Sequence, residues 1–264
     1  MNSRLEYELA GRVTLVTGAA RGIGKALALA FAAEGARLAV TARSEPELNA
    51  VAEEARGMGA NVVALPGDLM DRATPARLVR EVEAALGPVE ILINNAALGS
   101  AYSPRPVVQF DDDSWDRSLA INLTAPYLLS KAVLPSMIER KWGRIINIAS
   151  TASRTGSLHG AAYAATKHGL LGLTRTLALE LINDGITVNS ICPGPVRTEL
   201  NDRRLRYDAE RLGRTFEEHE KAVTPMGRRV EPEEVASLAV YLAGNRGNAI
   251  TGQAYNIDCG QVMS

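Results

Sequence analysis

The stretch V-T-L-V-T-G-A-A-R-G-I-G-K-A-L-A-L-A, residues 13–30, decides the fold. Its apolar start predicts a buried strand, and the glycine-rich turn after it leads into a helix beginning at Gly22. Glycines at Gly18, Gly22 and Gly24 allow a tight turn and let backbone amides at the positive helix end approach a pyrophosphate. The spacing G-x-x-x-G-x-G is looser than the usual dinucleotide fingerprint, so a tight turn without a ligand is the alternative interpretation.

The rest of the chain alternates short apolar runs with longer amphipathic segments. We predict strands over residues 13–17, 37–42, 61–65, 89–93, 144–149, 186–191 and 254–257. We predict helices over residues 22–34, 45–58, 74–86, 114–140, 160–183 and 232–243. Because strands alternate with helices and are rich in Val, Ile and Leu, they should pair in parallel and be buried on both faces. The sequence predicts one α/β domain over residues 1–264, a Rossmann-like doubly wound parallel sheet of about seven strands with helices on both faces.

Composition limits the partners of the chain. Its 264 residues are 46% hydrophobic and 22% charged, which is ordinary for a globular protein. A net charge of −1 leaves no basic surplus for nucleic acid or for an anionic membrane. The first ten residues hold no apolar signal-peptide core, and no run approaches the roughly 18 apolar residues of a membrane span. We expect a cytoplasmic protein that binds neither nucleic acid nor membrane.

Cysteine and histidine give no sign of a metal or a disulfide. The two cysteines, Cys192 and Cys259, form neither a Cys-x-x-Cys unit nor a disulfide framework, so we interpret both as small buried residues. The three histidines, His159, His168 and His219, show no ligand pairing on one helix face or hairpin. We therefore predict no metal site.

A serine, a tyrosine and a lysine form the strongest chemical pattern. Ser150 ends the apolar run that begins at Arg144, and Y-A-A-T-K places Tyr163 and Lys167 at i and i+4 on one helix face. A phenol with an ordinary pKa near ~10 exchanges protons poorly at neutral pH unless a neighbouring cation favours its phenolate. Lys167 supplies that cation, so we expect these three side chains to surround one substrate oxygen.

The same spacing occurs a second time. Tyr127 and Lys131 also read Y-x-x-x-K, and Ser114 lies thirteen residues before Tyr127, as Ser150 does before Tyr163. Ser114 follows the polar run Q-F-D-D-D rather than a strand, so we interpret it as a helix N-cap and the other two as ordinary helix residues.

Several motifs together resemble the short-chain dehydrogenase/reductase family. T-G-A-A-R-G-I-G, N-N-A-A, Asn122 in L-A-I-N-L, Ser150, Y-A-A-T-K and P-G-P-V-R-T occur in the order seen in that family, from about Gly11 to Gly260. The resemblance implies an oxidoreductase acting on CH–OH groups, which transfers a hydride between a nicotinamide coenzyme and a ketone or secondary alcohol. Two departures stand out: Ala97 and Cys259 occupy positions where the family usually has glycine.

The resemblance assigns catalytic roles residue by residue. Tyr163 is implied as general acid or base, and Ser150 as a hydrogen-bond partner of the substrate oxygen. Lys167 is implied to lower the phenol pKa and to hold the nicotinamide ribose. Asn122 is implied to hold a water beside the lysine, with a satisfied buried amide as the alternative.

Charge decides the expected coenzyme. NAD-dependent relatives place Asp after the second strand, where this chain has Ala42 followed by Arg43. Arg21 in the glycine loop adds a second guanidinium, and two such groups could bind a 2′-phosphate. We favour NADP(H), with NAD(H) served by Ser44 or Glu45 as the alternative. The implied cofactor-binding residues are Gly18, Arg21, Gly22, Ile23, Gly24, Arg43, Asp68, Leu69, Asn95, Tyr163, Lys167, Pro193, Gly194, Val196 and Thr198. For Asp68, a strand-end turn cap is the alternative.

Three segments should decide the substrate: residues 98–109, 151–160 and 199–224. The last alternates charged and apolar residues and predicts a helical lid, although an exposed helix pair with only a packing role is nearly as compatible. We expect Ser150, Tyr163 and His159 to contact substrate, with a surface histidine as the alternative for His159. The chain resembles members acting on 3-oxoacyl thioesters, 3-hydroxybutyrate and polyketide or cyclic ketones.

Other functions and the assembly state stay open at this stage. A catalytically idle dinucleotide sensor or scaffold would keep the same fold, and lyase or epimerase chemistry would retain the nicotinamide. The family resemblance implies a homotetramer, which would cover apolar surface on the long helices.

Overall fold

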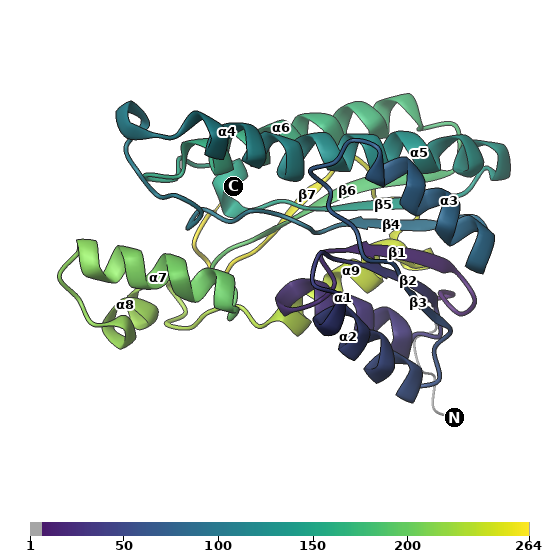
Figure 1. Cartoon of the computed structure of the whole chain (residues 1–264), viewed down its shortest axis with the longest axis horizontal. Coiled ribbons are helices and arrows are strands. Elements are labelled where there is room, and N and C mark those ends of the chain that lie inside the picture. Colours follow the sequence, from purple (N-terminus) through teal and green to yellow (C-terminus); the bar gives the residue numbers. More distant parts are fainter. Residues whose placement is uncertain (1–6, 264) are drawn as a thin grey trace.

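The computed structural model describes residues 7–263, which build a seven-stranded sheet in the order β3-β2-β1-β4-β5-β6-β7. All neighbouring strands run parallel, and the sheet lies between two layers of helices (Figure 1). The predicted doubly wound α/β fold is therefore confirmed. The strands are β1 (Val13–Thr17), β2 (Arg37–Thr41), β3 (Val62–Ala64), β4 (Ile91–Asn94), β5 (Gly143–Ile148), β6 (Ile186–Pro193) and β7 (Ala254–Ile257).

The helices divide between the two faces of the sheet. One face carries α1 (Gly22–Ala33), α2 (Glu45–Gly57) and α9 (Pro232–Ala243). The other carries α3 (Thr74–Leu86), α4 (Asp112–Leu119), α5 (Ala125–Arg140) and α6 (Ala161–Glu180) (Figure 1). Short helical turns occur at η1 (Val107–Gln109), η3 (Thr151–Ser153) and η4 (Asn245–Gly247).

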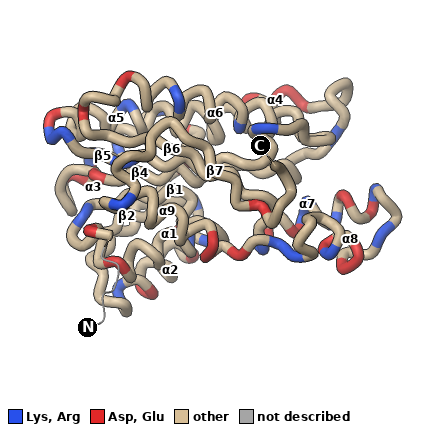
Figure 2. Tube along the Cα trace, turned by 180° about the vertical axis from the view of Figure 1, so that it is seen from behind, with Lys and Arg blue, Asp and Glu red and all other residues tan. Residues whose placement is uncertain are grey.

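The predicted lid forms two helices, α7 (Glu199–Arg211) and α8 (Phe216–Ala222), which project beyond the two layers (Figure 1). Charged residues of both signs follow one another along them (Figure 2). Buried Arg229 fastens this projection, because it forms ion pairs with Asp202 on α7 at 2.6 Å and with Glu220 on α8 at 2.7 Å. Whether the pair acts as a lid stays a prediction.

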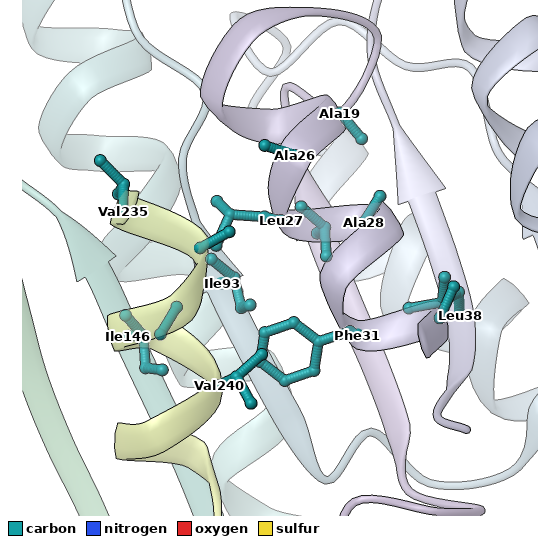
Figure 3. Packing of buried hydrophobic residues seen from close by; sticks show 14 of the residues in the cluster. Ala19, Ala26, Leu27, Ala28, Phe31, Leu38, Ile93, Ile146, Val235 and Val240 are labelled. Carbon is teal, nitrogen blue, oxygen red and sulfur yellow. The ribbon is translucent and has the colours of Figure 1, made fainter. Parts of the chain in front are cut away.

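Two hydrophobic cores hold the helices against the sheet. Phe31 of α1 is fully buried between the sheet residues Ile93 and Ile146 and the side chain of Val240 on α9 (Figure 3). On the opposite face, Leu78 of α3 and Leu129 of α5 belong to the second buried cluster. Both faces are thus apolar, as expected for parallel strands covered on each side.

The predicted helix over residues 114–140 begins earlier and is divided. A π-helical turn, η2 (Ala120–Thr124), separates α4 from α5. The N-cap is Asp111, whose carboxylate accepts a 2.8 Å hydrogen bond from the backbone N–H of Ser114. The N-cap prediction for Ser114 is therefore wrong, because an aspartate three residues earlier supplies the oxygen. Tyr127 and Lys131 of the second Y-x-x-x-K are exposed on α5.

The other boundaries differ from prediction by a few residues. The predicted helix 160–183 ends at Glu180, and the chain then turns through Gly185, whose φ is +67°. A Cβ on Gly185 would stand 2.2 Å from the carbonyl oxygen of Lys141, so this turn needs glycine. Part of the predicted domain, residues 1–6 and 264, lies outside the described residues.

Candidate active site

Ser150 lies two residues beyond the end of β5, where the chain enters η3. Its hydroxyl accepts a 3.1 Å hydrogen bond from the N–H of Ala152, and its own N–H donates to Ser153 Oγ at 3.1 Å. This capping box fixes the serine backbone at the carboxyl edge of the sheet. The structure therefore delivers Ser150 from a strand end, as the sequence predicted.

Tyr163 and Lys167 lie one turn apart on α6. The Lys167 ammonium is 5.7 Å from the centroid of the Tyr163 ring, and the Ser150 hydroxyl is close enough to the phenol to lower its pKa. Lys167 Nζ also donates to the carbonyl oxygen of Ile148 at 2.7 Å. The end of β5 and the first turns of α6 thus bring the serine, the phenol and the ammonium together.

Burial controls the protonation of both titratable groups. Desolvation lowers the Lys167 pKa from 10.5 to about 8, because the side chain is only 3% exposed. Desolvation also raises the Tyr163 pKa, while the nearby Ser150 hydroxyl opposes the rise. The expected lowering of the phenol pKa by Lys167 is therefore not what the structure gives: burial dominates, and it keeps the phenol protonated.

The side-chain amide of Asn122 is hydrogen-bonded to protein groups through both its oxygen and its nitrogen, and the water implied beside it stays a prediction. Asn122 lies in the π-helical turn η2, where its Oδ1 accepts from Leu98 N–H at 2.8 Å and its Nδ2 donates to Leu98 O at 3.0 Å. The same Nδ2 donates to Thr166 Oγ1 at 3.2 Å, and Thr166 is the residue before Lys167. Asn122 therefore joins the loop after β4 to α6, which matches the alternative of a satisfied buried amide.

A cavity of about 770 Å³ opens beside this group. Its lining includes Lys167 and Ile148 together with the glycine turn that leads into α1. The lining includes these residues expected to bind coenzyme: Gly18, Arg21, Gly22, Ile23, Gly24, Arg43, Asp68, Leu69, Asn95, Lys167 and Thr198. Lys167 thus connects the cavity to Tyr163 and Ser150.

The glycine turn is shaped for an anionic ligand. A Cβ on Gly24 would stand 2.0 Å from the carbonyl oxygen of Gly18, and a Cβ on Gly18 would stand 2.8 Å from Cα of Ala96. Within residues 7–263, no side chain caps the N-terminus of α1 and its first turn holds no acidic residue. The first N–H groups of α1 therefore remain available to a phosphate in the cavity.

The residues after the second strand fit a 2′-phosphate. Arg43 and Arg21 both line the cavity, and Ser44 lies beside Arg43 in the lining. Glu45, the alternative for an NAD ribose, does not belong to the described lining, whereas Glu47 does. Asp68 lines the cavity, and its Oδ1 accepts from Met70 N–H at 3.0 Å, as expected for a turn cap. Its contact with the coenzyme stays a prediction.

Several predicted residues lie outside this lining. Tyr163, Ser150, Asn122 and His159 are not among the described residues that form it. Pro193, Gly194 and Val196 are not among them either, since Val196 is buried in a bridge to Val230 and Gly194 packs on Asp258. The contacts implied for these last three stay predictions.

Helix α7 contacts residues 151–160, another of the segments expected to decide the substrate. His159, in a left-handed conformation with φ of 58°, bonds Tyr207 OH of α7 through Nδ1 at 2.6 Å. Arg204 of α7 donates to Leu158 O at 2.9 Å and pairs with Asp208 at 2.6 Å. His159 is therefore held against the lid, and its substrate contact stays a prediction.

Sequence reasoning missed part of the cavity wall. Arg197, Glu199 and Leu200 flank the predicted Thr198 and could have been found as a continuation of P-G-P-V-R-T. Nothing in the local sequence marked Ile121 or Glu47. The fold brings Ile121 to the cavity wall from η2 and Glu47 from α2.

Comparison with known proteins supports this geometry. A family profile described as enoyl-(acyl carrier protein) reductase matches residues 18–261, from the glycine turn to the C-terminal turn. The chain is a short-chain dehydrogenase/reductase. The family and the oxidoreductase class predicted from the sequence are thereby confirmed.

Individual members of the family are similar over almost the whole chain. The protein of Streptomyces violaceoruber named as granaticin polyketide synthase ketoacyl reductase 1 is 41% identical, with 94% of this chain and 92% of that protein covered. D-β-hydroxybutyrate dehydrogenase of Cupriavidus necator is 34% identical, with 96% and 99% covered. A crystal structure of an actinorhodin polyketide ketoreductase variant with NADPH matches with a TM-score of 0.90 at 37% identity, covering 95% and 97%.

Among residues 7–263, no group of three or more His, Cys, Asp and Glu side chains is arranged to hold a metal. Over the same residues, none of the helices combines the length and apolarity that a membrane crossing needs.

The shape of the glycine turn gives a testable prediction. Gly24→Ala should abolish or strongly weaken coenzyme binding, because its methyl would stand 2.0 Å from the Gly18 carbonyl oxygen. Gly57→Ala at the end of α2 is the matched control, since a Cβ there would meet nothing within 4 Å. Titration of NADPH fluorescence measures both, and equal binding by the two variants would contradict the role of the turn.

Proposed function

We propose that this short-chain dehydrogenase/reductase reduces a ketone with NADPH, using Tyr163 as the general acid. One observation carries the proposal: a buried ammonium, a phenol and a serine hydroxyl adjoin a cavity that begins at an uncapped helix N-terminus. The bound nicotinamide supplies the hydride in reduction and accepts it in oxidation.

The chain's own groups handle the proton and the developing charge. The Tyr163 phenol, whose pKa is raised by burial, is protonated at neutral pH and donates its proton to the carbonyl oxygen. Ser150 stabilises the same oxygen by a hydrogen bond. Lys167, held by the carbonyl of Ile148, provides positive charge that offsets the phenolate left behind.

The coenzyme preference rests on two guanidiniums. Arg21 and Arg43 line the cavity, and Arg43 has no ion-pair partner within residues 7–263, so it is available to a 2′-phosphate. The NADPH-bound ketoreductase with a TM-score of 0.90 supports the same choice.

The proposed substrate is a 3-oxoacyl compound. The names of two relatives, 3-oxoacyl-[acyl-carrier-protein] reductase and D-β-hydroxybutyrate dehydrogenase, both place an oxygen on the third carbon of an acyl chain. We propose that residues 98–109, 151–160 and 199–224 select the rest of the molecule. His159 and Tyr207 lie where two of these segments meet.

Loss of the phenol should separate binding from turnover. Tyr163→Phe should lower NADPH-dependent ketone reduction by about 10²- to 10⁴-fold while NADPH still binds, because only the transferable proton is removed. Absorbance of the dihydronicotinamide reports turnover with a panel of 3-oxoacyl thioesters and cyclic ketones.

The second Y-x-x-x-K of the chain supplies a matched control. Tyr127→Phe alters an exposed tyrosine at the same local spacing and should leave turnover unchanged. If the Tyr163→Phe protein turned over as fast as the Tyr127→Phe protein, the enzyme would have to use another acid. If neither variant nor wild type turned over any ketone while NADPH still bound, the chain would be a binding protein.

The Lys167 pKa gives a pH dependence with a defined sign. As pH rises through about 8, the buried lysine loses the charge that offsets the phenolate, so the reduction rate should fall. Tyr163 stays protonated there because its pKa is raised. The free energy of unfolding should rise over the same interval, because the unfolded chain holds the Lys167 proton up to 10.5. A reduction rate that is flat from pH 7 to roughly 10 would contradict this assignment.

We also propose a cytoplasmic homotetramer. Trp115 on α4, Tyr127 on α5 and Leu179 on α6 are exposed apolar side chains that closed assembly would cover. The cysteines Cys192 and Cys259 are both unpaired and buried, as is common in reducing compartments. Light scattering should give a mass of about four times 28.2 kDa, and a monomer or dimer would refute the tetramer.

A further inference from the structure

An ion pair between two residues of the cavity lining joins distant parts of the chain. Arg21 of the glycine turn donates from Nη1 to Glu199 Oε2 at 3.1 Å, although the two residues are 178 positions apart in the chain. Both side chains line the cavity, and they are 61% and 57% exposed. The pair therefore joins the phosphate-binding turn directly to the first residue of α7.

Glu199 carries a full negative charge at this position. Its carboxylate also pairs with Arg203 one turn later on α7, and the hydrogen bond from Arg203 together with the charge of Arg21 lowers the Glu199 pKa. A coenzyme brings phosphate groups of the same sign into the same cavity. Like charges at close range are unfavourable, so Glu199 and a coenzyme phosphate cannot both use Arg21 without cost.

The geometry points to Glu199 as an internal competitor of the coenzyme. We propose that, given the NADPH-dependent function above, Glu199 occupies Arg21 in the free enzyme and must yield it when a coenzyme phosphate binds. Glu199 then weakens coenzyme affinity and makes coenzyme release easier. Glu199 is then a specificity-determining residue: if Arg21 meets the 2′-phosphate, the competition weakens the binding of NADPH and not that of NADH.

Other contacts hold the first turn of α7 when Arg21 changes partner. Leu200, the next residue of α7, packs so closely on Gly99 that a Cβ there would stand 2.9 Å from Leu200 Cγ. Further along α7, Arg204 donates a hydrogen bond to Leu158 O, and the Tyr207 hydroxyl is hydrogen-bonded to His159 Nδ1. Asp202 in the same turn also pairs with Arg229 at 2.6 Å, so loss of the Arg21 contact leaves α7 in place and changes only the partners of Glu199.

A second carboxylate in the cavity wall, that of Glu47, provides a matched control. Glu47 is a second exposed carboxylate in the cavity lining, and it forms no ion pair within the described residues. Removing its charge tests the general effect of a carboxylate near the coenzyme. Only Glu199 should show an effect that depends on Arg21.

The experiment is a double-mutant cycle on NADPH affinity. Titration of NADPH fluorescence at low salt gives the Kd of wild type, E199Q, E47Q, R21Q and the double variants R21Q/E199Q and R21Q/E47Q. We expect E199Q to tighten binding about two- to fivefold, the range of an exposed ion pair, and the gain to shrink at high salt. In the R21Q protein, E199Q should no longer tighten NADPH binding. Any effect of E47Q on the NADPH Kd should be the same in the wild-type and R21Q proteins.

The outcomes separate this inference from the proposed function. If wild type binds no NADPH, the proposed function fails and the competition falls with it. If wild type binds NADPH but E199Q binds no more tightly, or tightens equally in the R21Q background, only the competition is overturned. Titration with NADH identifies the phosphate: a gain with both coenzymes indicates the shared pyrophosphate, and a gain with NADPH alone indicates the 2′-phosphate.

Discussion

The burial of the Lys167 ammonium is the constraint on which the active site depends. A lowering of its pKa from 10.5 to about 8 corresponds to about 3 kcal/mol of unfavourable folding free energy at neutral pH. The carbonyl oxygen of Ile148 accepts a 2.7 Å hydrogen bond from the ammonium, which partly offsets this cost. The ammonium serves both of its neighbours: it offsets negative charge on the phenol, and it adds positive charge to the wall of a cavity that takes an anionic coenzyme.

The surrounding hydrogen bonds explain how such a residue is held in place. Lys167 lies on α6 directly after Thr166, whose hydroxyl donates to Tyr163 O at 2.8 Å and accepts from Asn122 at 3.2 Å. Asn122 in turn grips both backbone groups of Leu98. One amide in a π-helical turn therefore fixes the loop after β4, the start of α6 and the cavity wall relative to one another. These protein contacts give Asn122 a positioning role.

The sequence predicted those parts of the site that are built from residues close together in the chain. The glycine turn, the strand end before Ser150 and the helix face shared by Tyr163 and Lys167 each follow from residues a few positions apart. Ser114 shows the limit, because Q-F-D-D-D offers several caps and only the structure shows that Asp111 takes the role. The π-helical turn at Asn122 and the contact of Arg21 with Glu199 depend on tertiary packing between distant segments. No periodicity or spacing encodes such pairs, and the phenol pKa likewise depends on burial that the sequence does not give.

The charges around the cavity suggest how tight binding and turnover are reconciled. Four cationic side chains line the cavity, Arg21, Arg43, Lys167 and Arg197, together with three carboxylates, Glu47, Asp68 and Glu199. Arg197 is already paired with Glu231 at 2.9 Å and with Glu220 at 3.1 Å, so little of its charge is available to a ligand. A cavity with unopposed cations would hold a coenzyme carrying several phosphate charges strongly and release it slowly. Because release or lid opening often limits turnover, a nearly balanced wall favours repeated exchange of coenzyme over the greatest affinity.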